Sequence, residues 1–317
     1  MAFGPGSPNS PSAEGILHPW ERGEAPPILP APKAVEHPKI NMIHKTLYHY
    51  LRKECEALDT AHNKLRSQPR NPAAVHEQRV GVKKLRAFFA LVDHIPDFSF
   101  KYNRYLNKLR FLQNIAGISR DAQLQARALT AHERRSNWRF GYAHLLLQER
   151  QALAAELMVA ASKRLKLGSF KELPDRFREE LEETDEKHLT TKLLEQVENN
   201  FREIKPPVSR AGHIAWHEVR KKVKEVYYQL TILKDVFPED PRYTYMLNFS
   251  RKAGELLGKW HDSSELSLFV SSTIRKARKE QLPVHLKATK LQEVLKQEAQ
   301  EQLALCASHL RNRKEKF

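Results

Sequence analysis

From about residue 41 to the C-terminus, apolar residues recur every three or four positions, with charged residues between them. This spacing places one apolar stripe along a helix, and the stripe can be buried only against neighbouring helices. No part of the chain shows the alternation of apolar and polar residues that a half-buried strand requires. We therefore predict an all-α fold class made of helical bundles.

Turn signals divide this region, among them QPRNP at 68–72, KPPVSRAG at 205–212 and FPEDP at 237–241. The predicted helices are 41–68, 72–94, 102–116, 119–134, 138–167, 170–183, 186–204, 212–236, 241–257, 259–280 and 285–312.

The first forty residues have a different composition. They contain nine of the 18 prolines and four of the 11 glycines of the chain. Each proline removes a backbone donor and fixes φ, so this segment cannot sustain a helix. We predict a Pro- and Gly-rich flexible leader at 1–40 and a folded helical domain at 41–317.

An internal repeat is the most informative feature of this domain. A shift of 141 residues aligns a His, an Arg, a Lys, a Gly and an Asp of the first half with the same residue types in the second. The aligned pairs are His76 and His217, Arg79 and Arg220, Lys83 and Lys224, Gly117 and Gly258, and Asp121 and Asp262. The shift predicts one repeat at about 41–181 and another at about 182–317. Duplication of a bundle explains matched apolar and glycine positions, but it explains matched basic residues less well.

The chain is strongly basic. Its 54 Lys and Arg against 38 Asp and Glu leave a formal charge of +16. Such an excess favours a polyanionic partner, such as nucleic acid, an anionic membrane surface or a phosphate polymer. The two cysteines do not form a CxxC pair, no stretch has the roughly 18 apolar residues of a membrane span, and the N-terminus lacks a secretory signal pattern. We therefore expect a cytoplasmic protein without a membrane partner.

The repeated residues share one side of their predicted helices. At 100° per residue, His76, Arg79, Lys83 and Arg86 lie together, and Leu85, Phe89 and Val92 lie opposite. His217, Arg220, Lys221 and Lys224 form the same arrangement in the second half.

Arg offers a planar fork of donors that fits two phosphate oxygens, Lys is a point charge, and His can donate a hydrogen bond. Two such faces could line one groove suited to a linear polyanion. The alternative is a solvated charged face on a surface helix. No HExxH, P-loop or GxSxG motif occurs, so we predict no metal site, no catalytic residue and no cofactor.

The segments VHEQRVGVKKLR and GISRDAQL, followed by WHEVRKKVKEVYY and LLGKWHDSSEL, resemble the CHAD family, the conserved histidine α-helical domain. The resemblance covers about 41–312. It implies two pseudo-symmetric four-helix bundles around a basic central channel, binding of long-chain inorganic polyphosphate and association with polyphosphate granules.

The resemblance carries over to single residues. His76, Arg79, Lys83 and Arg86 match the first motif, and His217, Arg220, Lys221 and Lys224 match the second. The resemblance adds Lys84 and Arg120 to the polyphosphate-binding residues. The chain departs from the family pattern at His261, which replaces an Arg before Asp262, and at Glu225, which aligns with Lys84. These departures put an equal contribution of the two halves in doubt.

Three functions remain open from the sequence. The first is a non-enzymatic polyphosphate-binding module. The second is a protein that binds the backbone of RNA or DNA, although no aromatic run is interleaved with the basic residues for base stacking. The third is an enzyme acting on polyphosphate or nucleotides, although phosphoryl transfer normally needs acidic metal ligands, which the basic faces lack.

Overall fold

Helices account for most of the described chain. The computed structural model describes residues 43–93, 95, 100–164, 167–208, 212–234, 236 and 240–313, so the predicted leader at 1–40 lies outside the described residues. Their elements are α1 (Ile43–Ser67), α2 (Pro72–Val92), α3 (Asn103–Ser136), α4 (Gly141–Arg164), the 3₁₀ turn η3 (Gly168–Phe170), α5 (Leu173–Glu182), α6 (Glu186–Arg202), α7 (His213–Leu233), α8 (Pro241–Lys279) and α9 (Leu286–Arg311). No strand occurs among these residues, which confirms the predicted all-α class.

Several helices begin where the sequence places a capping residue. The side chain of Asn71 accepts hydrogen bonds from the backbone N–H groups of Ala73 and Ala74, and Pro72 follows as the first residue of α2. Asp240 and Pro241 start α8 in the same way. These side chains satisfy N–H groups that have no partner within the helix, and proline has no N–H to leave unpaired at this position.

α3 and α8 are each continuous, so the prediction of separate helices at 102–116 and 119–134, and at 241–257 and 259–280, was wrong. The predicted breaks lay next to Gly117 and Gly258. A glycine inside a helix costs only about 1 kcal/mol relative to alanine, and tertiary packing can offset that amount. Both helices are therefore longer than the glycine positions suggested.

The buried apolar side chains form two clusters. The larger one joins α1, α2, α5, α6 and α7 with the N-terminal parts of α3 and α8 and the C-terminal parts of α4 and α9. The smaller one joins the C-terminal parts of α3 and α8 with the N-terminal parts of α4 and α9. The larger cluster contains residues from both predicted repeats. The division into two bundles stays a prediction.

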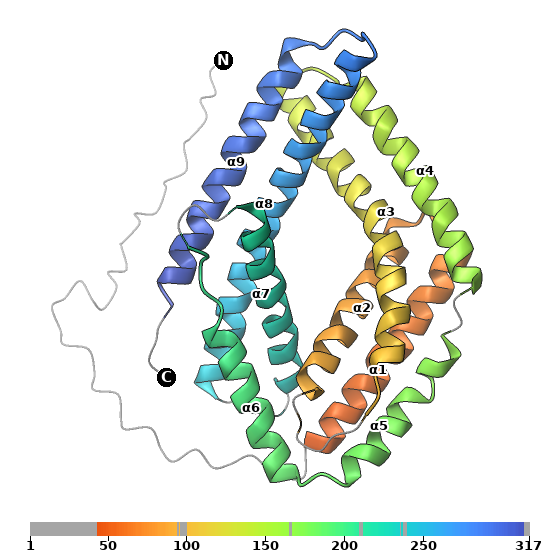
Figure 1. Cartoon of the computed structure of the whole chain (residues 1–317), viewed down its shortest axis with the longest axis vertical. Helices are drawn as coiled ribbons and strands as arrows, with labels where there is room; N and C mark the ends of the chain where they lie inside the picture. Colours follow the sequence, from red (N-terminus) through yellow and green to blue (C-terminus); the bar gives the residue numbers. More distant parts are fainter. Residues whose placement is uncertain are drawn as a thin grey trace, which may run out of the picture. The chain divides into compact units, whose positions relative to one another are not determined.

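α2 and α7 pack against each other at the centre of this arrangement (Figure 1). α3 packs along α4, and α8 packs along α9, as two long antiparallel pairs. The first residues of α2 and α7, Pro72 and His213, are 141 positions apart, and so are the last, Val92 and Leu233. The ends of these two helices therefore agree with the predicted shift of 141 residues. That the two halves of the chain superpose, and that a basic channel lies between them, stay predictions.

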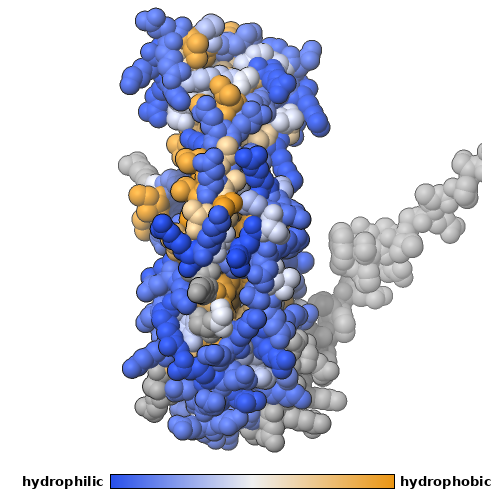
Figure 2. Space-filling view, turned by 90° about the vertical axis from the view of Figure 1, so that its right-hand side faces the viewer, coloured by the Kyte–Doolittle hydropathy of each residue, from blue (hydrophilic) through white to orange (hydrophobic). Residues whose placement is uncertain are grey.

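The face of the molecule that Figure 2 shows is mostly hydrophilic. Figure 2 shows one face of the molecule, on which apolar side chains appear as separate groups among hydrophilic ones. On the long helices α3 and α4 the exposed apolar residues include Phe111, Ile118, Leu145, Leu153 and Leu157. None of the described helices is long and apolar enough to cross a membrane.

Candidate anion-binding site

The apolar stripe of α2 determines where its basic residues lie. Val82, Leu85 and Phe89 are fully buried in the larger core cluster. The opposite side of the helix carries Arg79 and Lys83, both half-buried. Burial of the stripe therefore holds the basic side chains at the edge of the core instead of in bulk water.

α7 is built in the same way. Val223, Val226 and Leu230 are buried, while Arg220 and Lys224 are half-buried on the other side. The wheel predicted from the sequence is therefore confirmed for both helices.

The basic residues of the two helices meet. Burial, followed by the charges of Lys224, Arg79 and Arg220, lowers the pKa of Lys83 to about 7. Burial, followed by the charge of Arg220, lowers the pKa of Lys224 to about 8, and Arg79 acts in the same direction. A lysine in water has a pKa near 10.4, and both burial and like charge disfavour the protonated form. The structure thus brings the Arg and Lys of both motifs into one region.

Helix α3 adds Arg120 to this region. Burial and then the charges of Arg127 and Arg79 lower the pKa of Arg120. We call Arg79, Lys83, Arg120, Arg220 and Lys224 the cationic cluster. Arg127 was missed in the sequence analysis, although it follows Arg120 by two helical turns and so lies on the same side of α3.

Two carboxylates lie against the cluster. Asp121 forms an ion pair with Arg79, with 3.8 Å between Oδ1 and Nη2. Asp262, the aligned residue of the second half, lies near Arg220 and Lys224; burial nevertheless raises its pKa. Asp121 therefore pairs with one cation of the cluster and Asp262 lies near two others, so these two carboxylates neutralise only part of the positive charge of the cluster.

The Arg79 guanidinium lies directly against Gly117 of α3. A Cβ atom at position 117 would lie 2.8 Å from Arg79 Nη1, which is closer than real Cβ contacts. At Gly258, the aligned glycine, nothing lies within 4 Å of such a Cβ atom. The absence of a side chain at Gly117 therefore leaves space for the Arg79 guanidinium, whereas no side chain occupies the corresponding space at Gly258.

Arg220 has a donor without an acceptor. Its Nε is buried and has no hydrogen-bond partner among the described residues. Buried polar groups are nearly always paired, so an unpaired guanidinium donor beside other cations indicates a place for an anionic oxygen.

The motif histidines carry little charge at neutral pH. Burial, followed by the charges of Arg120, Lys83 and Arg79, lowers the pKa of His76. Burial, followed by Lys221 and Arg220, lowers that of His217. Both rings are therefore mainly neutral hydrogen-bonding groups in the protein without ligand.

His261 makes the halves unequal. Burial, followed by the charge of Arg220, lowers the pKa of His261 to about 3. The second half therefore has a neutral side chain where the first half has the Arg120 cation.

Three predicted site residues have partners outside the cluster. Lys84 Nζ lies 2.8 Å from Glu54 Oε1 on α1. Lys221 Nζ lies 2.7 Å from Glu218 Oε1, and Arg86 donates to Gln113 Oε1 at 2.9 Å. The structure does not bring these three residues into the cationic cluster, and it gives Lys84 a structural role because Glu54 is buried.

Replacing Lys84 by methionine should lower the free energy of unfolding by about 1–3 kcal/mol, because it leaves the buried Glu54 carboxylate without its cation. The exposed pair Lys221–Glu218 supplies the control, since Lys221→Met should change stability by less than about 1 kcal/mol. Urea denaturation of both variants measures the difference. Equal stability of the two variants would contradict a structural role for Lys84.

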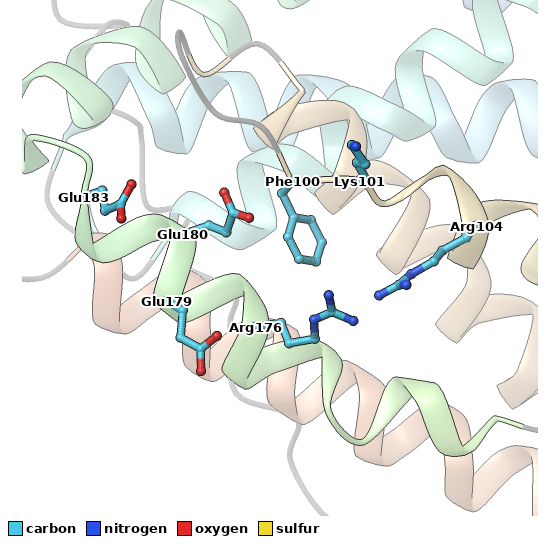
Figure 3. Close-up of a pocket in the computed structure, with 7 residues that line it drawn as sticks. All are labelled: Phe100, Lys101, Arg104, Arg176, Glu179, Glu180 and Glu183. Carbon is cyan, nitrogen blue, oxygen red and sulfur yellow. The ribbon is translucent and has the colours of Figure 1, made fainter.

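A pocket of about 530 Å³ lies away from these residues. Figure 3 shows Arg104 and Phe100 facing α5, which carries Arg176, Glu179 and Glu180 and ends next to Glu183. Its lining mixes acidic and basic groups, so it lacks the single sign of charge that a polyanion needs.

The fold and the cluster define a class of all-helical protein in which two basic helices pair across a shared core. The chain belongs to the CHAD domain family, whose model matches residues 49–271. This matched range contains α2, α3 and α7 in full, and it therefore includes the whole cationic cluster.

Two solved structures share the fold. One is the crystal structure of the CHAD domain from the plant Ricinus communis, with a TM-score of 0.63 and 13% sequence identity, covering 92% of this chain and 98% of that chain. The other is PptA from Streptomyces chartreusis, with a TM-score of 0.53 and 16% identity, covering 84% of this chain and 97% of that chain. No curated protein matches the chain.

Proposed function

We propose that this protein binds long-chain inorganic polyphosphate at the cationic cluster without altering it chemically, and that binding directs the protein to polyphosphate granules. The observation that carries the proposal is the convergence of Lys83 and Lys224 with Arg79 and Arg220, which lowers the pKa of both lysines. Membership of the CHAD family supports the choice of polyphosphate among the anions.

The shape of the cluster favours an extended anion. From His76 to Lys83, α2 advances about 10 Å at 1.5 Å per residue, and α7 presents the same length from His217 to Lys224. A chain with a negative charge on every phosphate unit can contact several of these cations at once, whereas a single phosphate can contact few. Linked contacts increase affinity because the later ones are intramolecular.

The carboxylates of the cluster favour binding over catalysis. Phosphoryl transfer normally uses acidic groups to hold metal ions at the phosphates. Asp121 is paired with Arg79, and Asp262 lies near Arg220 and Lys224. We therefore assign both aspartates to the orientation of basic side chains and propose no enzymatic activity.

The proposal is tested by titrating the full chain with long-chain polyphosphate, double-stranded DNA and RNA at matched phosphate concentration and physiological salt. We expect polyphosphate to bind at least about tenfold more tightly than either nucleic acid, and all affinities to fall as salt rises because counterion release weakens. Equal affinities would reduce the function to general polyanion binding. Release of phosphate in the presence of Mg²⁺ would show an enzyme instead.

The glycine pair supplies a further prediction. Gly117→Ala should displace the Arg79 guanidinium and weaken polyphosphate binding by about three- to tenfold, a part of the roughly 1.5–3 kcal/mol that a charged hydrogen bond contributes. Its stability should stay the same or rise by up to about 1 kcal/mol, because alanine favours a helix and the displaced atoms end a flexible side chain.

The matched control is Gly258→Ala, where the added Cβ has open space. It should gain stability and retain full affinity. Calorimetric titration and thermal denaturation of both variants measure the two effects, and equal affinities of the variants would contradict the role assigned to Gly117.

A further inference from the structure

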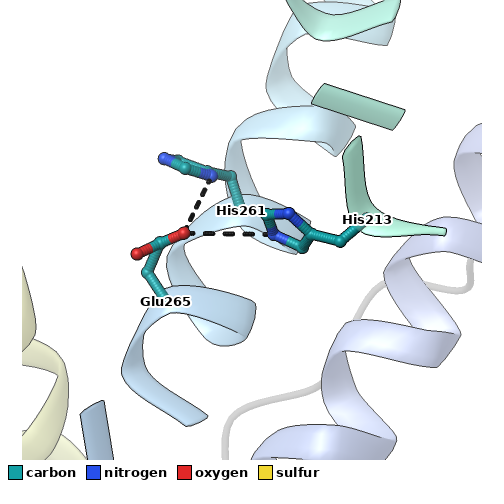
Figure 4. Close-up of side chains that lie close together, drawn as sticks. All are labelled: His213, His261 and Glu265. Carbon is teal, nitrogen blue, oxygen red and sulfur yellow. Dashed lines mark ion pairs between the residues drawn. The ribbon is translucent and has the colours of Figure 1, made fainter. Parts of the chain in front are cut away.

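A second group of side chains lies at the junction of α7 and α8. It consists of His213, the first residue of α7, together with His261 and Glu265 of α8. Figure 4 shows both imidazole rings beside the Glu265 carboxylate. His213 Nε2 and His261 Nδ1 each lie 3.9 Å from the same oxygen, Glu265 Oε1, and the three candidate ligand atoms all lie within 4.8 Å of one another.

The helices hold these groups in place. His261 and Glu265 are four residues apart, so they lie one above the other on the same side of α8. The packing of α7 on α8 brings His213 to them, and the Trp260 ring contacts the His213 ring with 4.8 Å between their centroids. All three residues therefore lie on helices, with His213 at the first position of α7.

The contacts within the group are incomplete. A separation of 3.9 Å is too long for a hydrogen bond. His261 Nδ1 is buried and has no hydrogen-bond partner among the described residues. The gap is too small for a water molecule between the two groups, but a metal ion coordinated by both atoms can span it, because two ligand bonds of about 2.0–2.2 Å bridge such a distance.

We propose that His213, His261 and Glu265 bind a divalent transition-metal ion of the zinc class. Imidazole nitrogen and carboxylate oxygen are zinc ligands, and three protein ligands leave an open position for water or an anion. Ligand distances of about 2.0–2.2 Å in tetrahedral geometry place the donor atoms about 3.4 Å apart. The two separations from Glu265 Oε1 are 3.9 Å, and all three donor atoms lie within 4.8 Å of one another, so rotation of the side chains has to bring them closer together around an ion.

The surrounding charge is mixed. Arg220 lies near both His261 and Glu265, and Lys224 lies near His261; both cations oppose a metal ion, whereas Asp121 and Asp262 near Glu265 favour one. The affinity of this site for a metal ion therefore comes from the coordination bonds to its three ligands more than from attraction by neighbouring charges.

The site belongs to the second half of the chain alone. In the 141-residue register, His213, His261 and Glu265 align with Pro72, Arg120 and Leu124, and among these three no residue is a usual zinc ligand. The site is therefore distinct from the repeated basic motif, and it does not rest on polyphosphate binding. The sequence contains one signal for it, the His-x-x-x-Glu spacing on a predicted helix, but the third ligand comes from another helix.

The test is a titration of the full chain, without a histidine tag and without polyphosphate, using Zn²⁺ in calorimetry and Co²⁺ in visible absorption. We expect one ion per chain. His261→Gln, His213→Gln and Glu265→Gln should each weaken binding by about tenfold or more, because each removes one of three ligands. His188→Gln, which changes an exposed histidine on α6, should bind as the wild type does.

Two results would overturn the proposal: absence of saturable binding to the wild type, and unchanged binding by the three ligand variants. His213 is exposed, so His213→Gln tests the site even if a change at the half-buried His261 disturbs folding. Circular dichroism of each variant identifies such a disturbance.

Discussion

Replacing Arg79 and Arg220 together by alanine should weaken the binding of long-chain polyphosphate by at least about 100-fold at physiological salt. Charge-assisted hydrogen bonds contribute roughly 1.5–3 kcal/mol each, and about 1.4 kcal/mol corresponds to tenfold in affinity. Both guanidinium groups are half-buried at the junction of α2 and α7, so water screens their charges less than it screens exposed ones.

The control removes the same charge elsewhere. Lys290 and Lys296 are exposed on α9, which packs on α8. The variant Lys290→Ala with Lys296→Ala should lose less than about tenfold in affinity, because it weakens only the general attraction of a basic protein for a polyanion. Calorimetric titration of both double variants measures the contrast. A similar loss in the two variants would place the binding site outside the cationic cluster.

Affinity for polyphosphate should fall by at least about tenfold between pH 7 and pH 9. In the protein without ligand, Lys83 has a pKa of about 7 and Lys224 of about 8. A bound polyanion favours the protonated forms and raises both pKa values. Binding above pH 7 therefore takes up protons, and it weakens as pH rises.

The same lysines predict the opposite trend for stability. Their folded-state pKa values lie below those of the unfolded chain, so between pH 7 and pH 8.5 the unfolded chain binds more protons than the folded one. The free energy of unfolding should therefore rise with pH in this range. Above pH 8.5 the two cysteines reverse this trend. Burial raises the pKa of Cys55 and Cys306 to about 12, so their thiols lose protons in the unfolded chain before they do in the folded one, and the free energy of unfolding then falls with pH.

The variant Lys83→Met with Lys224→Met tests both trends, because it removes the groups that titrate. Its affinity should be low and nearly independent of pH from 7 to 9, and its melting temperature should not rise from pH 7 to 8.5. Calorimetry and thermal denaturation in matched buffers provide the data. A pH dependence equal to that of the wild type would show that other groups cause it.

Much of the fold could be predicted because helical periodicity is local. Residues three and four apart lie on one side of a helix in any tertiary context, so Leu85 and Phe89 indicate the buried side of α2. The basic side then follows as its opposite. The same reasoning failed at Gly117, because a glycine within a helix looks the same in sequence whether it ends the helix or admits a neighbouring side chain.

Which basic residues of a helix join the cationic cluster could not be predicted from the sequence of that helix alone. Lys83 and Lys84 are adjacent and of the same type, yet Lys83 joins the cationic cluster and Lys84 pairs with Glu54, thirty positions earlier in the chain. Adjacent helical residues are about 100° apart, and the neighbouring helix on each side decides which role each one has.

The sequence by itself determined that the chain is helical and that α2 and α7 each carry a basic side opposite an apolar one, since both properties arise from spacing along the chain. Only the tertiary structure decided that Lys83 lies near the charges of Lys224 and Arg220 and that His213 lies beside His261 and Glu265. The physical reason is that pKa shifts and ligand geometry depend on distances between separate helices. Those distances are set by how the helices pack, and no spacing along one helix records them.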